Sequence, residues 1–255
     1  MKSVVMVGGS VQLIQAVKVA QSMGFYVIVT DRNPEAPCFE VADQCVIIDG
    51  REVEGLAAYV MSNKDKYGIK GVFTLTEMVT SVAVIAEAAG LPGVPIASAV
   101  ACQNKALSKK IWLKAGVATP RAFIATSRSE AADFFEELGG KAFVKTPVGF
   151  GGQGCAKVES ISELHDAFME AFKISPDKGV IIEDYLTGSM HDVNALYDSR
   201  HNLHLVSVTD RFFHESYPIE VEARCPSSLS PVQQQNLFHV VDQAARALGI
   251  TFGPV

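Results

Sequence analysis

A short glycine-rich segment between two β-prone runs carries the residues best suited to chemistry. Lys145 ends the apolar run 141–145, and glycine fills four of six loop positions after it, namely Gly149, Gly151, Gly152 and Gly154. Glycines lack Cβ atoms and let backbone N–H groups come close to an anion, while the lysine adds a positive charge. The segment therefore predicts a flap over the phosphates of a nucleotide. A glycine-rich turn without a ligand is the alternative.

The glycine spacing also matches the dinucleotide-binding fingerprint, at Gly149, Gly151 and Gly154. That fingerprint needs a helix that opens directly on the glycines. Here the β-prone run 155–158 follows, and the next helical pattern begins near Ser160. We therefore expect the glycines at the tip of a β-hairpin. No Gly-Lys-Ser/Thr sequence closes the loop, so it is not a Walker A loop either.

Composition narrows the class of protein. The chain has 255 residues, 48% of them hydrophobic, and a formal net charge of −6, which argues against general nucleic-acid binding. No apolar run is long enough to span a bilayer, and the N-terminus reads as a strand and not as a signal peptide. The five cysteines form no Cys-x-x-Cys pair, which predicts reduced thiols. We expect a cytoplasmic protein with neither nucleic acid nor membrane as partner.

Strands and helices alternate over the first hundred residues, which predicts a parallel, doubly wound α/β sheet. The expected strands are 2–7, 26–30, 42–48 and 71–75, and the expected helices are 11–23 and 55–67. Ligands of such sheets bind at the carboxyl ends of the strands. Thr76 falls there, together with four residues that are candidate substrate contacts: Gly8, Gly9, Asp31 and Glu77. Ordinary turn chemistry is the alternative for each of them.

The rest of the chain reads as α+β. A helix is expected over 98–115, and the predicted small subdomain after it has strands at 122–125, 141–145, 155–158 and 180–186. Its helices begin at Ser127 and Ser160, and each serine precedes a glutamate three residues on, which predicts two capping boxes. Antiparallel strands follow at 192–196 and 203–209, and Ser230-Pro231 starts a last helix.

Four segments, in this order, resemble the ATP-grasp superfamily, in particular its biotin carboxylase and carbamoyl-phosphate synthase-like branch of carboxylate–amine ligases. They are GGSVQLIQAVKVAQSMGFYVIVTDRNPEAPCFEVADQCVIIDG, KALSKKIWLKAGVATPRAF, FVKTPVGFGGQGCAKV and VIIEDYLTGSMHDVNAL. The resemblance implies a Rossmann-like pre-ATP-grasp domain over 1–97 and a linking helix over 98–117. It further implies an ATP-grasp lid subdomain over 118–186 and the first part of a C-terminal subdomain over 187–255.

The resemblance also implies phosphate contacts for part of the chain. Lys105 and Lys145 would contact the phosphates of ATP. Gly151, Gly152 and Gly154 would close over these phosphates through their backbone N–H groups.

The remaining implied contacts follow the small subdomain. The adenine pocket would be lined by four consecutive residues: Glu183, Asp184, Tyr185 and Leu186. His191 would bind the ribose hydroxyls. Arg211 is a candidate for a substrate carboxylate or phosphate, which a guanidinium binds bidentately, with an ordinary surface arginine as the alternative.

The activity that the resemblance implies is ATP-dependent ligation: a small carboxylate, or bicarbonate, becomes an acyl-phosphate that an amine attacks. It uses ATP and Mg²⁺. Family members hold Mg²⁺ through a Glu…Glu-x-Asn pattern after a Gly-Pro turn, and here Gly253-Pro254 stands at the end of the sequence. Glu215, Glu220 and Glu222 come earlier, in a stretch that reads as a loop. We therefore expect no Mg²⁺ ligand in this chain, ligands beyond Val255, and an incomplete enzyme.

Two other functions stay open. One is a non-catalytic ATP-binding or partner subunit of a split ATP-grasp enzyme. The other is an NAD-binding Rossmann oxidoreductase that uses Gly8 and Gly9, although a third glycine at the proper spacing is missing. The expected partners are small-molecule carboxylate and amine substrates, together with a second copy of the chain or the other part of a split enzyme.

Overall fold

The computed structural model describes residues 2–149, 151–214 and 220–255. The chain divides into two compact units, Met1–Gln103 and Asn104–Val255. None of the helices described is long and apolar enough to cross a membrane.

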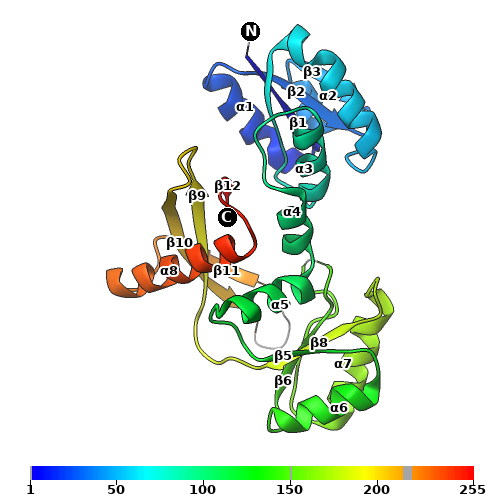
Figure 1. Cartoon of the computed structure of the whole chain (residues 1–255), viewed down its shortest axis with the longest axis vertical. Coiled ribbons are helices and arrows are strands. Elements are labelled where there is room, and N and C mark those ends of the chain that lie inside the picture. Colours follow the sequence, from blue (N-terminus) through cyan, green and yellow to red (C-terminus); the bar gives the residue numbers. More distant parts are fainter. Residues whose placement is uncertain (1, 150, 215–219) are drawn as a thin grey trace. The chain divides into compact units, whose positions relative to one another are not determined.

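The first unit is a parallel sheet with helices on both faces, as the alternating pattern predicts (Figure 1). Its strand order is β3-β2-β1-β4, with β1 at Ser3–Val7, β2 at Tyr26–Asp31, β3 at Gln44–Ile47 and β4 at Ile69–Phe73. Its helices are η1 (Val11–Leu13), α1 (Ile14–Ser22), η2 (Pro37–Glu40), α2 (Val53–Tyr67), α3 (Val79–Ala88) and α4 (Ile96–Gln103).

Side chains of β1 point alternately into two hydrophobic cores. Val5 and Val7 belong to the core shared with α2 and α3, whereas Met6 packs with Val17 of α1. All four side chains are fully buried. Because both faces of the sheet are covered, its central strands read as continuous apolar runs and not as alternating ones.

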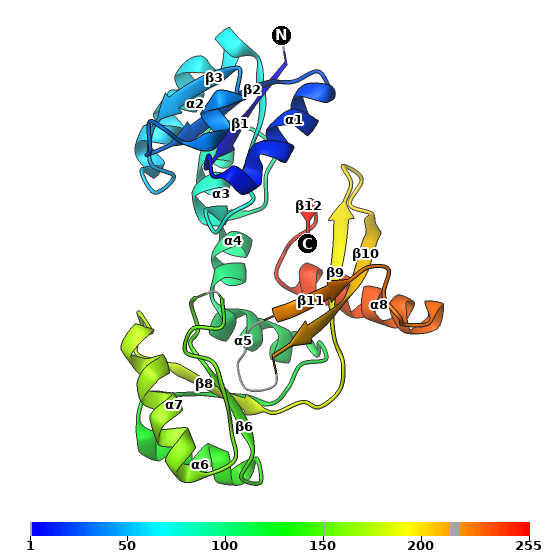
Figure 2. The ribbon, with the colours of Figure 1, turned by 180° about the vertical axis from the view of Figure 1, so that it is seen from behind.

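The second unit contains a small antiparallel sheet of order β5-β8-β6-β7. Its strands are β5 (Ala122–Ala125), β6 (Ala142–Lys145), β7 (Ala156–Val158) and β8 (Val180–Asp184). The helices α6 (Arg128–Glu137) and α7 (Ile161–Ile174) lie beside each other on the sheet (Figure 2). Their apolar faces bury Phe135, Leu164 and Phe168 against Val144 and Ile182. The opposite face of the sheet carries Lys145 and Glu183, which are described below, beside the apolar Ile181.

A second antiparallel sheet, of order β11-β10-β9-β12, completes this unit. Its strands are β9 (Met190–Tyr197), β10 (Leu203–Phe213), β11 (Glu220–Arg224) and β12 (Gly253–Pro254). Two helices accompany it, α5 (Lys105–Ala115) and α8 (Pro231–Ala247). The only tryptophan of the chain, Trp112 on α5, donates a hydrogen bond from Nε1 to the carbonyl oxygen of Ala244 on α8, at 3.0 Å.

Two expectations about secondary structure were wrong. The helix expected over 98–115 is two helices, because Asn104 has extended backbone angles and its side chain accepts a hydrogen bond from the N–H of Leu107. Asn104 is thus an N-cap, and Lys105 is the first residue of α5. Glu220 and Glu222 do not lie in a loop but on β11, which pairs with β10, while Glu215 lies outside the described residues.

The two capping boxes form in a modified way. Ser127 and Ser160 each accept a hydrogen bond from the N–H of the glutamate three residues on, as expected. The glutamate side chains, however, accept from Thr126 and Glu159, one residue before each cap. The hydrogen bonds from Thr126 hold the pKa of Glu130 below its ordinary value. At the start of α8, the Ser230 hydroxyl accepts from the N–H of Gln233, and the Gln233 side chain accepts from the N–H of Ser230. This capping box is therefore complete.

Candidate functional site

The predicted hairpin is present, and its glycines are required by its backbone. β6 and β7 pair antiparallel, with the glycine-rich loop between Lys145 and Ala156. The backbone angle φ is positive at four loop glycines: +139° at Gly149, +65° at Gly151, +75° at Gly152 and +63° at Gly154. Residues with a Cβ rarely adopt such angles, so the loop conformation itself accounts for the glycines.

The two ends of the glycine run have different surroundings. A Cβ added to Gly154 would lie 2.8 Å from Cδ1 of Ile174 and 3.2 Å from Cα of Ala171, both on α7. A Cβ added to Gly151 would meet no atom of the described residues within 4 Å. Gly154 therefore packs the hairpin against a helix, whereas Gly151 stands in open space from which backbone groups can approach a ligand.

Lys105 connects helix α5 to the hairpin. Its backbone N–H donates to the carbonyl oxygen of Pro147 at 2.8 Å, and its Nζ donates to that of Gly149 at 2.6 Å. Burial is the main cause that lowers the pKa of Lys105, and the charge of Lys145 lowers it further, against an opposing effect of Cys155. The two lysines that the sequence assigned to phosphates thus lie near one another.

Lys145 and Glu183 form an ion pair across neighbouring strands. Lys145 on β6 is opposite Ile181 on β8, so its side chain shares a face of the sheet with Glu183, two residues along. Lys145 Nζ donates to Glu183 Oε1, and the carboxylate of Glu183 is also paired with Lys109, at 2.8 Å from Nζ to Oε2. The Glu183 side chain is 8% exposed and the Lys109 side chain 9%.

Sequence reasoning missed Lys109. A signal for it was present, because Lys105 and Lys109 are four residues apart on one helix and therefore lie on one face. With Lys105, Lys109 and Lys145 set against Glu183, this cluster holds three ammonium groups and one carboxylate, an excess of two positive charges. Cys155 adds no charge, since burial raises the pKa of its thiol although Lys105 and Lys145 oppose this rise. An excess of partly buried positive charge fits a polyanion such as a nucleotide phosphate chain.

The other residues expected at the adenine pocket differ in their side-chain contacts. Asp184 holds Arg121 bidentately, at 3.0 Å from Nε and 2.8 Å from Nη2, and these hydrogen bonds lower the pKa of Asp184. The ring of Tyr185 lies 4.9 Å and 5.2 Å from the Nζ atoms of two lysines, Lys141 and Lys157. Leu186 is 67% exposed, so it is available to pack on an aromatic ring.

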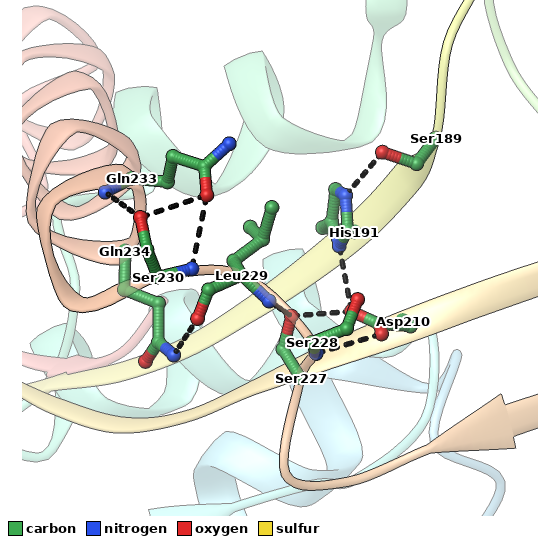
Figure 3. A network of polar contacts seen from close by, with 9 residues as sticks. All are labelled: Ser189, His191, Asp210, Ser227, Ser228, Leu229, Ser230, Gln233 and Gln234. Atoms are coloured by element: carbon green, nitrogen blue, oxygen red, sulfur yellow. Dashed lines mark hydrogen bonds and ion pairs between the residues drawn. The ribbon is translucent and has the colours of Figure 1, made fainter.

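His191 has a protein partner on each ring nitrogen (Figure 3). Nδ1 lies 2.8 Å from Oδ1 of Asp210, and Nε2 lies 2.6 Å from Oγ of Ser189. Asp210 also accepts hydrogen bonds from the hydroxyl of Ser227 and the N–H of Ser228, which together hold its pKa far below the ordinary value. The ribose contact expected of His191 stays a prediction, and both ring nitrogens already have partners here.

Arg211 is engaged by two carboxylates. Its guanidinium pairs with Asp192 on β9 and with Glu220 on β11. A substrate contact of Arg211 therefore stays a prediction, and it would require the guanidinium to share or exchange these partners.

The four candidate substrate contacts of the first unit do meet. Gly8, Gly9, Asp31 and Glu77 all line one cavity of about 240 Å³ at the carboxyl ends of the parallel strands. Two arginines, Arg32 and Arg51, also line it. The cavity thus presents both guanidinium and carboxylate groups.

The turn at Gly9 is unlike a dinucleotide-binding turn. The N–H of Gly9 donates to Oδ2 of Asp31 at 2.7 Å, so this donor is occupied by a carboxylate. A Cβ on Gly9 would lie 2.9 Å from that of Ala36, which explains the glycine by packing. Nothing in this turn favours the oxidoreductase alternative.

Comparison with known proteins identifies the family. Residues 104–253 match the family described as carbamoyl-phosphate synthase L chain, ATP binding domain. The match covers more than half of the chain, which therefore belongs to this family and, with it, to the ATP-grasp superfamily.

Individual relatives agree with this assignment. D-alanine–D-alanine ligase of Pseudomonas fluorescens is 28% identical over 169 residues, which are 64% of this chain and 52% of the relative. Among solved structures, L-amino acid ligase from Bacillus licheniformis superposes with a TM-score of 0.78 at 23% identity. The superposition covers 100% of this chain and 62% of the ligase chain. N5-carboxyaminoimidazole synthetase from Staphylococcus aureus, complexed with ADP, superposes with a TM-score of 0.81 at 16% identity. The superposition covers 96% of this chain and 63% of the synthetase chain.

These structural similarities confirm the expected fold, a Rossmann-like α/β unit followed by ATP-grasp α+β structure. The chain spans about half the length of the curated relatives that it matches.

Proposed function

We propose that this chain is the ATP-binding part of a ligase that activates a small carboxylate, or bicarbonate, for attack by an amine. The observation that carries the proposal is the meeting of Lys105 and Lys145 beside the glycine hairpin, with Lys145 paired to Glu183 of the neighbouring strand β8. The relatives support it, since their names are those of two ligases and a synthetase, and the synthetase is complexed with ADP.

In the proposed reaction, a carboxylate oxygen of the substrate attacks the γ-phosphorus of ATP and ADP leaves. The amine then attacks the carbonyl carbon of the acyl-phosphate, and inorganic phosphate leaves with the oxygen that formed the new P–O bond. The role of the protein in such a transfer is mainly to position the phosphates and neutralise their charge. Lys105 and Lys145 would do this, and backbone groups near Gly151 would cover the phosphate chain.

Mg²⁺ belongs to the proposed chemistry, because it neutralises phosphate oxygens. Among the residues described, no group of three or more histidine, cysteine, aspartate or glutamate side chains is placed to hold a metal ion. We therefore assign no residue to Mg²⁺ and derive no step through it.

The cavity of the first unit is the proposed substrate side. Arg32 and Arg51 suit a carboxylate or a phosphate, and Asp31 and Glu77 suit an ammonium group. A substrate that carries both charges, such as an amino acid, would use both sets of groups.

An oxygen-18 transfer experiment tests the proposed reaction. The chain is incubated with Mg²⁺, ATP, an amine and a small carboxylate labelled with oxygen-18 in its carboxyl group. An acyl-phosphate intermediate requires that one labelled oxygen appears in the inorganic phosphate released. ADP formation with unlabelled phosphate would contradict the proposal. Nucleotide binding without turnover would favour the non-catalytic subunit instead.

A further inference from the structure

Lys109 is a buried lysine on α5 with three protein oxygens around its ammonium group. Its Nζ lies 2.8 Å from Oε2 of Glu183, 2.8 Å from Oγ1 of Thr119 and 3.3 Å from the carbonyl oxygen of Pro120. The contacts with Thr119 and Pro120 are hydrogen bonds, and the contact with Glu183 is an ion pair. It joins the helix, the segment before β5, and strand β8 at a single point.

Lys145 differs from Lys109 in this respect. Glu183 is the one hydrogen-bond partner of Lys145 Nζ within the described ranges, and the Lys145 side chain is 20% exposed. Two of its donors therefore stay available to an anion. The same carboxylate thus joins Lys109, which is buried and has three protein partners, to Lys145, which is partly exposed and has one.

We propose that Lys109 is a positioning residue, which fixes the carboxylate of Glu183 so that Glu183 in turn holds Lys145 toward the nucleotide phosphates. The inference rests on the proposed nucleotide site and adds a residue to it. Without Lys109, Glu183 would lose one of its two charge partners and could turn toward Lys145 alone. A lysine held in one geometry loses less rotamer freedom on binding, and positioning of this kind contributes to affinity.

The test measures binding of ADP and of adenosine by calorimetry. Positioning of Lys145 affects the phosphates only, so we expect Lys109→Met to weaken ADP binding about tenfold and to leave adenosine binding unchanged. Lys109→Arg, which keeps the charge, should recover most of the ADP affinity. The matched control is Lys110→Met, since Lys110 is the next residue of α5 and is exposed; it should change neither affinity.

A second variant covers the event that Lys109→Met does not fold. Thr119→Val removes one partner of Lys109 Nζ and keeps the lysine, and it should weaken ADP binding a fewfold without affecting adenosine. Equal losses for both ligands, or no loss for ADP, in a folded variant would overturn the positioning role. Failure of the unmodified chain to bind either ligand would instead overturn the proposed nucleotide site, and this inference with it.

Discussion

The carboxylate of Glu183 on β8 holds the ammonium group of Lys145 on the neighbouring strand β6. The sequence placed the first residue at an adenine pocket and the second at the phosphates, as separate contacts. Their pairing means that the small sheet itself orients the lysine, before any ligand is present. In the proposed nucleotide site, phosphate binding by Lys145 would therefore depend on Glu183 as well.

The hairpin glycines provide a matched pair of variants for stability. Gly151→Ala places a Cβ in open space and should cost about 1 kcal/mol, which is the strain of a positive φ. Gly154→Ala adds the same strain and also a close contact with Ile174 and Ala171, so it should cost about 1–3 kcal/mol more. Urea unfolding followed by Trp112 fluorescence measures both. Equal losses of stability would show that α7 does not pack on Gly154 as described.

Asp210 should give stability a specific pH dependence. Hydrogen bonds from Ser227 and Ser228 hold its pKa far below the ordinary value. Its ionised form therefore stabilises the folded chain above the unfolded-state pKa of about 3.9, and this contribution is lost as the pH falls further. Asp210→Asn should thus melt below the unmodified chain at about pH 7, and the difference should shrink toward about pH 3.

The control for this titration is Asp133→Asn, because Asp133 is exposed on α6. Its melting temperature should follow that of the unmodified chain at every pH. A difference for Asp210→Asn that stays constant from neutral to acid pH would exclude the charge of Asp210 as the cause.

The hydrogen bond between α5 and α8 should be measurable through Trp112. Trp112→Phe removes the donor to the carbonyl of Ala244, which keeps the N–H of Leu248 as a second partner. Because the acceptor is not left unpaired, the loss should be about 1 kcal/mol, observed as a lower urea midpoint by far-UV circular dichroism. An unchanged midpoint would mean that this contact does not stabilise the second unit.

Local signals in the sequence predicted most of the fold. The hairpin followed from glycines between β-prone runs, and the start of α8 followed from Ser230-Pro231. The strand Glu220–Arg224 was missed because all its side chains are exposed and only pairing with β10 makes it a strand. The break at Asn104 depends on one side-chain hydrogen bond to Leu107, which competes with a continuous helix.

The candidate site was predictable in outline only. Lys105 and Lys145 stood out because they flank recognisable elements, whereas Lys109 joins the cluster through an ion pair with a residue 74 positions later, Glu183. One partner of His191 is likewise set by the pairing of β9 with β10, which brings Asp210 opposite it. Contacts of this kind are properties of the tertiary structure and leave little trace in local sequence patterns.

Nucleotide binding by the second unit is the central claim, and ADP titration of the unmodified chain and of Lys145→Met measures it most directly. The unmodified chain should bind ADP, and Lys145→Met should weaken binding at least about tenfold, through loss of a charge-assisted hydrogen bond. Lys173→Met is the control, since Lys173 is an exposed lysine paired with Glu170 on α7, and it should bind like the unmodified chain. No ADP binding by the unmodified chain, or equal binding by Lys145→Met, would contradict the account.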